Sequence, residues 1–185
     1  MKFENIVKML KKSAKEKGAN FAKLILTKDI FVEDHVRLKC QYGCDRFARL
    51  FTCPPYAPTP DETRKILKNC KQGLLVEFTG MRNREEQRDV HEIMYELERE
   101  AFLNGLYKAF AYTAGPCRIC ESCPAEKVES PNEFSKKDCK NPEKARPSME
   151  ACGIDVYRTA RKAGCKINVV KEGERFKSFG LLLLE

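Results

Sequence analysis

The chain carries the stretch CRICESC at residues 117–123, in which Cys117, Cys120 and Cys123 form a CxxCxxC motif. Cys139 follows further along the same polar segment. Thiolates are soft anionic ligands, and several of them close together without a cation would repel one another. In a CxxCxxC motif, a tight loop supplies three ligands of a cubane cluster and the fourth comes from elsewhere. The motif therefore predicts an iron–sulfur cluster, with Cys139 as the nearest candidate for the fourth ligand.

The loop that surrounds this motif, residues 116–147, has no sustained apolar period. It is rich in Cys, Pro, Ser, Asn and Lys. A structureless segment of this length is unusual in a compact domain unless it has a function. We therefore expect bound metal to organise the loop and to replace the apolar core that it lacks.

A second group of cysteines lies in a predicted loop at residues 40–58. Its members are Cys40, Cys44 and Cys53. A fourth ligand is expected to come from another part of the chain or to be missing. The candidates elsewhere are Cys70, Cys152 and Cys165. If the fourth ligand is missing, one iron keeps an open position that acts as a Lewis acid toward a substrate oxygen or sulfur.

Other arrangements of these cysteines stay open. In a crossed arrangement, Cys53 serves the first site and Cys139 serves the second. Zinc is the alternative metal at both sites because thiolates bind either metal, although zinc sites usually take their ligands as two separate pairs. The second group also fits three small apolar side chains that pack in a loop. Cys70, Cys152 and Cys165 are expected in the core.

Helices are predicted where apolar residues recur at a spacing of three or four. They are expected at residues 3–14, 59–70, 90–102 and 148–163. The second of these begins with a capping box of Thr59 and Glu62, and Pro60 occupies its first position. Short apolar runs predict strands or extended segments at residues 21–26, 30–38, 73–79, 107–113, 166–170 and 175–184. Both cysteine groups are thus expected to begin where a strand ends.

This order of elements predicts an α+β or α/β fold. We expect a two-layer domain with a mixed β-sheet, helices packed on the sheet, and two cysteine-rich metal-binding loops. A length of 185 residues and a hydrophobic content of 42% fit one domain that covers residues 1–185.

Composition and the absence of certain motifs argue against several classes of protein. Residues 1–17 carry lysines around isolated apolar residues and lack the apolar segment of a secretory signal, so we expect reduced cysteines in the cytoplasm. No segment approaches the roughly twenty apolar residues of a membrane span, so no membrane association is expected. The net charge of +8 permits a nucleic-acid surface, but a solvated charged face is the preferred interpretation. The motifs of nucleotide-binding folds, serine hydrolases and zincins are absent.

Three larger motifs can be taken together. They are Cys40-x3-Cys44-x8-Cys53-Pro54-Pro55-Tyr56-x-Pro58, Cys117-x2-Cys120-x2-Cys123, and Cys139-x2-Pro142-x3-Arg146-Pro147-Ser148-Met149-Glu150-Ala151 followed by Gly153-Ile154-Asp155-Val156. From about residue 23 to the C-terminus, the chain resembles the predicted metal-binding family known as domain of unknown function 2284. Members occur largely in archaea and anaerobic bacteria, which implies an environment that tolerates oxygen-sensitive clusters. The resemblance implies seven candidate ligands, Cys40, Cys44, Cys53, Cys117, Cys120, Cys123 and Cys139, and assigns no activity.

Three functions are consistent with these observations. The first is a redox protein with one or two [4Fe-4S] clusters that exchanges electrons with a partner protein, favoured because no catalytic constellation is recognised. The second is an enzyme that binds a small-molecule substrate at an open iron of the Cys40, Cys44 and Cys53 group. The third, ranked below the others, is a zinc-structured interaction or nucleic-acid-binding module, suggested by the basic N-terminal segment.

Overall fold

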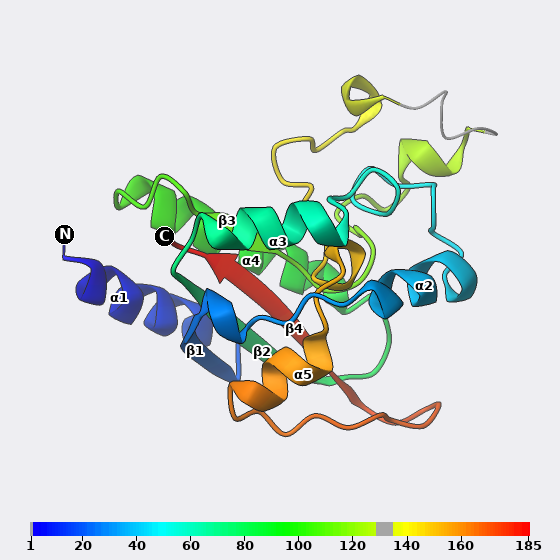
Figure 1. The fold of residues 1–185 in the computed structure, drawn as a ribbon. Helices are drawn as coiled ribbons and strands as arrows, with labels where there is room; N and C mark the ends of the chain where they lie inside the picture. The colour runs from blue at the N-terminus through cyan, green and yellow to red at the C-terminus, as the bar shows by residue number, and fades with distance from the viewer. Residues whose placement is uncertain (1, 129–134) are drawn as a thin grey trace.

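A four-stranded antiparallel sheet forms the centre of the protein (Figure 1). The structure, a computed structural model, describes residues 2–128 and 135–185. The strands are β1 (Phe21–Leu26), β2 (Gln72–Met81), β3 (Phe110–Tyr112) and β4 (Phe176–Leu183). Their order across the sheet is β1-β2-β4-β3, and every pairing between them is antiparallel. The central strands β2 and β4 are buried along most of their length, as expected for strands that are covered on both faces.

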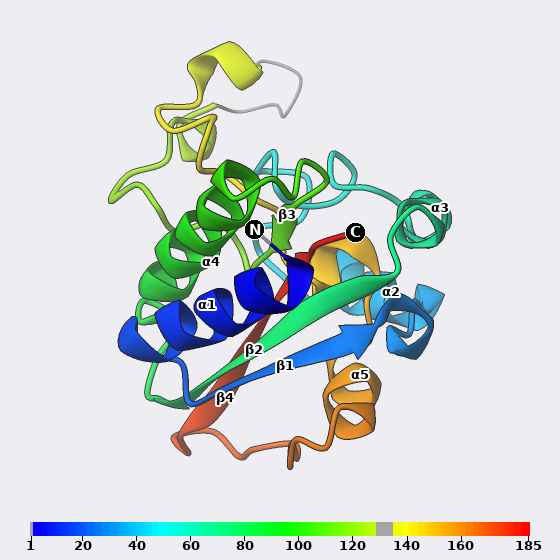
Figure 2. The ribbon, with the colours of Figure 1, turned by 90° about the vertical axis from the view of Figure 1, so that its left-hand side faces the viewer.

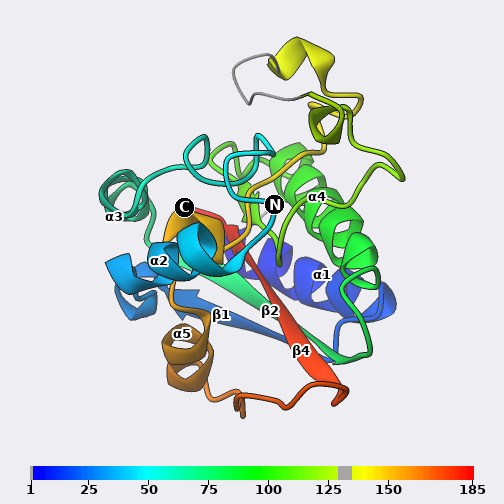
Figure 3. The same ribbon diagram turned by 90° about the vertical axis from the view of Figure 1, so that its right-hand side faces the viewer.

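Helices cover both faces of this sheet (Figures 2 and 3). On one face, α1 (Phe3–Glu16) and α4 (Gln87–Leu103) pack against alternate residues of the central strands, such as Leu74 and Leu182. The opposite face carries α3 (Pro60–Lys68), α5 (Val156–Lys162) and the 3-10 turn η5 (Glu150–Cys152) against Leu75 and Leu181. Because neighbouring residues of a strand point to opposite faces, two separate apolar cores result.

The predicted α+β fold is confirmed, and the arrangement differs in two details. The sheet is antiparallel throughout its named strands, where a mixed sheet was expected. Helices lie on two faces, where two layers were expected. The helices predicted near residues 3–14, 59–70 and 90–102 are present, and α3 begins with the expected capping box of Thr59 and Glu62.

The extended segment predicted at residues 30–38 is wrong in its second half. Extended backbone ends near Val32, which bridges to Ile154, and α2 (Asp34–Gly43) follows. Ile30 and Val32 are the apolar residues that suggested a strand, and they precede the helix. Asp34 then lies in the first helical turn, where the helix dipole favours an acidic side chain. The Cys40 group therefore begins inside a helix and does not follow a strand.

The single helix predicted at residues 148–163 is also wrong, because it is interrupted at Gly153. This glycine adopts a left-handed conformation with φ +79° and ends η5. Asp155 then caps α5 by accepting a hydrogen bond of 2.9 Å from the Arg158 backbone N–H. The break turns the chain between Cys152 and α5.

The strand predicted at residues 166–170 is not formed. Ile167, at 8% exposed, is the one buried residue of this segment, and Val169 and Val170 are exposed to solvent. The Ile167 carbonyl accepts hydrogen bonds from the Arg161 guanidinium at 3.3 and 3.1 Å. A side chain thus satisfies a backbone group that a neighbouring strand would otherwise have to pair.

Gly153 gives a test of this local geometry. A Cβ atom at this position would lie 2.9 Å from Cγ of Pro60, whereas Gly173, with φ +84°, has open space around it. We expect Gly173→Ala to lose about 1 kcal/mol of unfolding free energy from backbone strain, and Gly153→Ala to lose about 2–4 kcal/mol because overpacking adds to the strain. Urea unfolding of both variants measures this difference. Equal losses would contradict the close contact with Pro60.

Candidate metal centre

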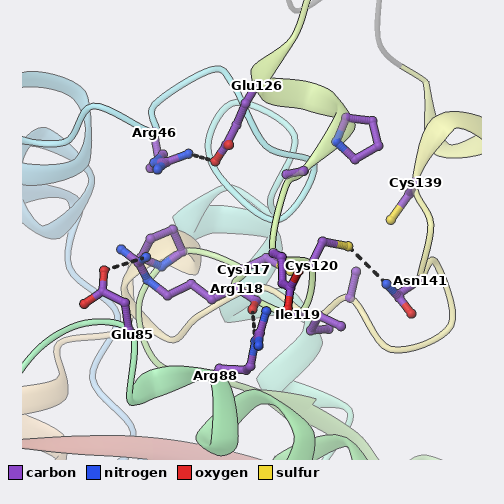
Figure 4. A pocket seen from close by; sticks show the side chains of 15 residues that line it. Arg46, Glu85, Arg88, Cys117, Arg118, Ile119, Cys120, Glu126, Cys139 and Asn141 are labelled. Atoms are coloured by element: carbon purple, nitrogen blue, oxygen red, sulfur yellow. Dashed lines mark hydrogen bonds and ion pairs between the residues drawn. The ribbon is translucent and has the colours of Figure 1, made fainter.

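The first cysteine group is brought together around one cavity (Figure 4). Cys117, Cys120, Cys123 and Cys139 all line this first cavity, which has a volume of about 320 Å³. Cys120 Sγ accepts a hydrogen bond of 3.1 Å from Nδ2 of Asn141. The four cysteines predicted as ligands of the first site therefore line the same cavity.

The second cysteine group lines a separate cavity. Cys40 lies in the last turn of α2, Cys44 is the residue that follows this helix, and Cys53 is in the irregular segment beyond it. All three line the second cavity, which has a volume of about 360 Å³ and also includes Pro116 and Glu150. Pro116 lines both cavities, so the two cysteine groups are neighbours.

A small apolar cluster joins the two cysteine loops. Leu50, Cys53 and Ala125 are its buried members, and Cys123 and Cys139 pack against them. Arg46 also forms an ion pair with Glu126 across the same junction. The loops therefore pack on each other, and Cys53 lies between residues of both groups.

Cys117 also lies close to the second group. Burial raises the pKa of the Cys53 thiol to about 12, and negative charge on Cys44, Cys40 or Cys117 raises it further. The order along the chain supports this position, because Cys117 directly follows Pro116. Sequence reasoning assigned Cys117 to the first group alone, and no local pattern indicates its proximity to Cys53.

The other candidates for a fourth ligand lie outside the second cavity. Cys70, Cys152 and Cys165 belong to the core cluster on the α3 and α5 face of the sheet, as expected. Among them, Cys165 is near Glu77, whose hydrogen bond and charge add to burial in raising its pKa to about 11. None of the three lines either cysteine cavity.

The thiols of each group line a cavity and do not converge on one point. A tetrahedral zinc site holds its sulfur atoms about 3.8 Å apart, given a Zn–S bond of about 2.3 Å. Within the described ranges 2–128 and 135–185, no three His, Cys, Asp or Glu side chains are grouped closely enough to hold one metal ion. The thiols instead surround cavities many times the roughly 30 Å³ that a water molecule occupies in the liquid.

Burial keeps several of these thiols protonated when no cation is bound. It raises the pKa of Cys117 to about 11, against the opposing effect of a backbone hydrogen bond from Ile119. It also raises the pKa values of Cys40 and Cys123. Because a metal binds the thiolate, loading these sites must release protons.

A comparison with protein-family models matches residues 23–184 to the family described as predicted metal-binding protein, DUF2284. The chain belongs to this family. Searches of curated proteins and of solved structures found no significant match. The matched range includes both cavities, so metal binding is the property that the family and the cysteine arrangement have in common. Over the residues described, no helix combines the length and apolar character needed to cross a membrane.

The two histidines of this DUF2284 protein line neither cysteine cavity. His91 is fully buried in α4, and its Nε2 lies 3.1 Å from the Ala114 carbonyl oxygen. Burial lowers the His91 pKa to about 4, so the ring is neutral and links α4 to the segment after β3. His91 is thus a core residue of α4. His35 is exposed and lines a different groove, beside α2.

An ion pair ties the end of the 116–147 loop to α4. Arg146 donates from Nε and Nη2 to the two carboxylate oxygens of Glu98, at 2.8 and 2.6 Å. Glu98 also accepts a hydrogen bond of 2.7 Å from the Ala111 backbone N–H in β3. The arginine packs near the rings of Tyr95 and Phe110. Both charged side chains are largely buried, at 16% and 13% exposed, so the pair depends on both members.

Replacement of Arg146 tests this ion pair. Arg146→Met leaves Glu98 charged, buried and without its partner, so we expect a loss of about 3–5 kcal/mol in unfolding free energy. Arg82→Met is the matched control because Arg82 pairs with Glu86 at an exposed position, and there we expect a loss below about 1 kcal/mol. Urea unfolding measures both. Similar losses in the two variants would mean that the pair of Glu98 and Arg146 contributes no more to stability than an exposed ion pair does.

The core cysteines predict a pH dependence of stability. Burial raises the pKa of Cys152 from 9.0 to about 12. Between these values the unfolded thiol has lost its proton while the folded thiol keeps it, so stability must fall as pH rises above about 9. The Cys152 thiol alone lowers the unfolding free energy by up to about 1.4 kcal/mol for each pH unit in this range. Urea unfolding between pH 8 and 11 should show a shallower decline for Cys152→Ala than for the natural chain, and parallel curves would contradict the assignment.

Proposed function

We propose that this protein binds two [4Fe-4S] clusters, one in each cysteine-lined cavity, and transfers electrons to or from a partner protein. The observation that carries the proposal is the pair of neighbouring cavities, each lined by at least three cysteines and each larger than a single ion requires. Bound clusters of this type supply one-electron redox chemistry. The membership in a metal-binding family supports the metal.

Seven thiols divide unequally between two clusters. Cys120, Cys123 and Cys139 would hold the first cluster, and Cys40, Cys44 and Cys53 would hold the second. Cys117 lines the first cavity and lies near Cys53, so it would complete one of the two sets. One cluster then has three cysteine ligands, which leaves one iron for a different ligand.

The charges around the first cavity are balanced. Arg46, Arg88 and Arg118 line it together with Glu85, Glu121 and Glu126, and ion pairs join Arg46 to Glu126 and Arg118 to Glu85. Arg88 donates a hydrogen bond of 3.0 Å to the Arg118 carbonyl. These side chains therefore supply no net positive charge that would raise the reduction potential of a cluster held there. Leu50 and Ala125 form a small buried cluster against Cys123 and Cys139, which line this cavity.

A second candidate function is an enzyme that binds its substrate at an open iron of the second cluster. One observation favours it: the second cavity shares five of its lining residues with a larger groove beside α2. A cluster that only transfers electrons needs no such groove. The iron left without a cysteine ligand would then act as a Lewis acid toward a substrate oxygen or sulfur.

The zinc-structured nucleic-acid module is less well supported. Lys17, at the end of the basic helix α1, pairs with Glu96 and Glu100 of α4 at 2.5 and 3.6 Å. Ser13 of α1 also donates a hydrogen bond to Glu100. Part of the basic charge of α1 therefore compensates the acidic face of α4, which leaves less of it for phosphates.

Metal analysis of protein purified without oxygen tests the proposal. We expect a brown protein with about eight iron and eight sulfide per chain. Cys120→Ala and Cys44→Ala should each lower the iron content to about four. Cys70→Ala is the matched control because Cys70 is buried outside both cavities, and it should keep all the iron.

Two results would overturn the proposal. Colourless protein with stoichiometric zinc would replace it with a structural zinc site. Iron near four per chain that is unaffected by Cys44→Ala would leave only the first cluster. Iron near eight together with the two variant effects would support both clusters.

A further inference from the structure

A groove beside the second cavity has the size of a small-molecule site. Its volume is about 630 Å³, within the usual range of roughly 300–1,000 Å³ for such sites. The walls come from α2, the start of α5, residues 166–170 and β4. We call it the basic groove, because of the charges described next.

Cations outnumber acids along the basic groove. The cations are Lys39, Arg84, Lys166, Arg175 and Lys177, and the acids are Glu150 and Asp155. Lys177 is neutralised by Glu77, at 3.1 Å. Over the described part of the chain, no ion pair is formed by Lys39, Arg84 or Lys166, and all three side chains are exposed. Their positive charge is therefore available to a ligand.

The two acids of the groove offset only part of this positive charge. Asp155 accepts a hydrogen bond from the Arg158 backbone N–H at the start of α5. Oε2 of Glu150 is shielded from solvent and has no hydrogen-bond partner among the described residues. Burial raises the Glu150 pKa, which favours its neutral form. A buried polar atom without a partner is uncommon in a folded protein, and a bound ligand would supply the missing hydrogen bond.

The basic groove leads to the second cysteine cavity. Both are lined by Val36, Lys39, Arg84, Gln87 and Glu150. The Gln87 amide is fixed by a hydrogen bond of 3.1 Å from its Nε2 to the Ser178 hydroxyl. A ligand in the groove would thus lie beside Lys39 and Arg84, which also border the Cys40, Cys44 and Cys53 cavity, whereas Lys166 lines the groove alone.

We propose that the basic groove binds a small organic anion, with its carboxylate or phosphate group held by Lys39, Arg84 and Lys166 beside the Cys40, Cys44 and Cys53 cavity. The binding step depends on the groove alone. The approach to a metal rests on the proposed function of the second cavity. The concave shape favours a small molecule over a nucleic acid, whose backbone needs a longer basic surface.

Calorimetric titration of the metal-loaded protein, kept free of oxygen, tests the binding step. Succinate represents carboxylates, glycerol phosphate represents phosphate esters, and succinamide is the uncharged match for succinate. We expect at least one anion to bind more tightly than succinamide, and added salt to weaken that binding because the cations are exposed. The tighter of the two anions identifies the group that the site recognises.

Variants locate the site. Arg84→Gln should weaken the anion's affinity about tenfold, and the double variant Lys39→Gln with Lys166→Gln should weaken it further. Arg99→Gln is the matched control, since Arg99 is exposed on α4 and lies outside the groove, and it should leave the affinity unchanged. The proposal is overturned if neither anion exceeds succinamide or if Arg99→Gln weakens binding as much as Arg84→Gln.

Iron analysis and electronic spectra of the same samples separate this inference from the proposed function. Anion binding to protein that lacks iron would contradict the proposed clusters and support the anion site in the groove. Full iron content without anion binding would contradict the anion site and support the clusters. A spectral change on anion binding, absent in Arg84→Gln, is expected if the ligand reaches the second cluster. Binding with unchanged spectra would overturn that approach to the metal.

Discussion

The ion pair between Glu98 and Arg146 is the contact on which the cysteine-rich half of the protein depends. Residues 116–147 bring little apolar surface of their own, so they must be held from outside. Glu98 belongs to α4 and also accepts a hydrogen bond from the backbone of β3. Through Glu98, Arg146 is therefore connected to both α4 and β3. Near the same end of the loop, Thr113 and Ser148 form a parallel bridge. The loop thus leaves and rejoins the core at adjacent points.

The position of the candidate metal centre is related to where this loop is attached to the core. Both ends of the loop lie near β3, and its cysteines lie beside the segment that follows α2. There the small cluster of Leu50, Cys53 and Ala125 joins the two loops. Such a cluster is too small to order two long loops by burial alone, since about 25 cal/mol is gained per Å² of apolar surface. Metal–thiolate bonds would add the cohesion that this part of the chain lacks.

The sequence predicts well what depends on local pattern. The capping box at Thr59 and the apolar face of α4 depend only on residues that are close together in the sequence, and both are found where they were expected. Residues 30–38 were misread because Ile30 and Val32 do lie in extended chain, and the change to helix at Asp34 depends on contacts with distant residues such as Gly153. The proximity of Cys117 to Cys53 is a product of how two loops pack, and no spacing in either loop encodes it.

Charged side chains are paired differently in two regions of the molecule. At one end, α1 packs against α4, and Lys17 is engaged by two glutamates of α4. Beside α2, three cations have no acidic partner in the described chain, although Glu150 lies in the same groove. Unpaired positive charge repels itself and gains nothing for folding. Its concentration in a concave site next to three cysteines would be explained by the anion that we propose binds there.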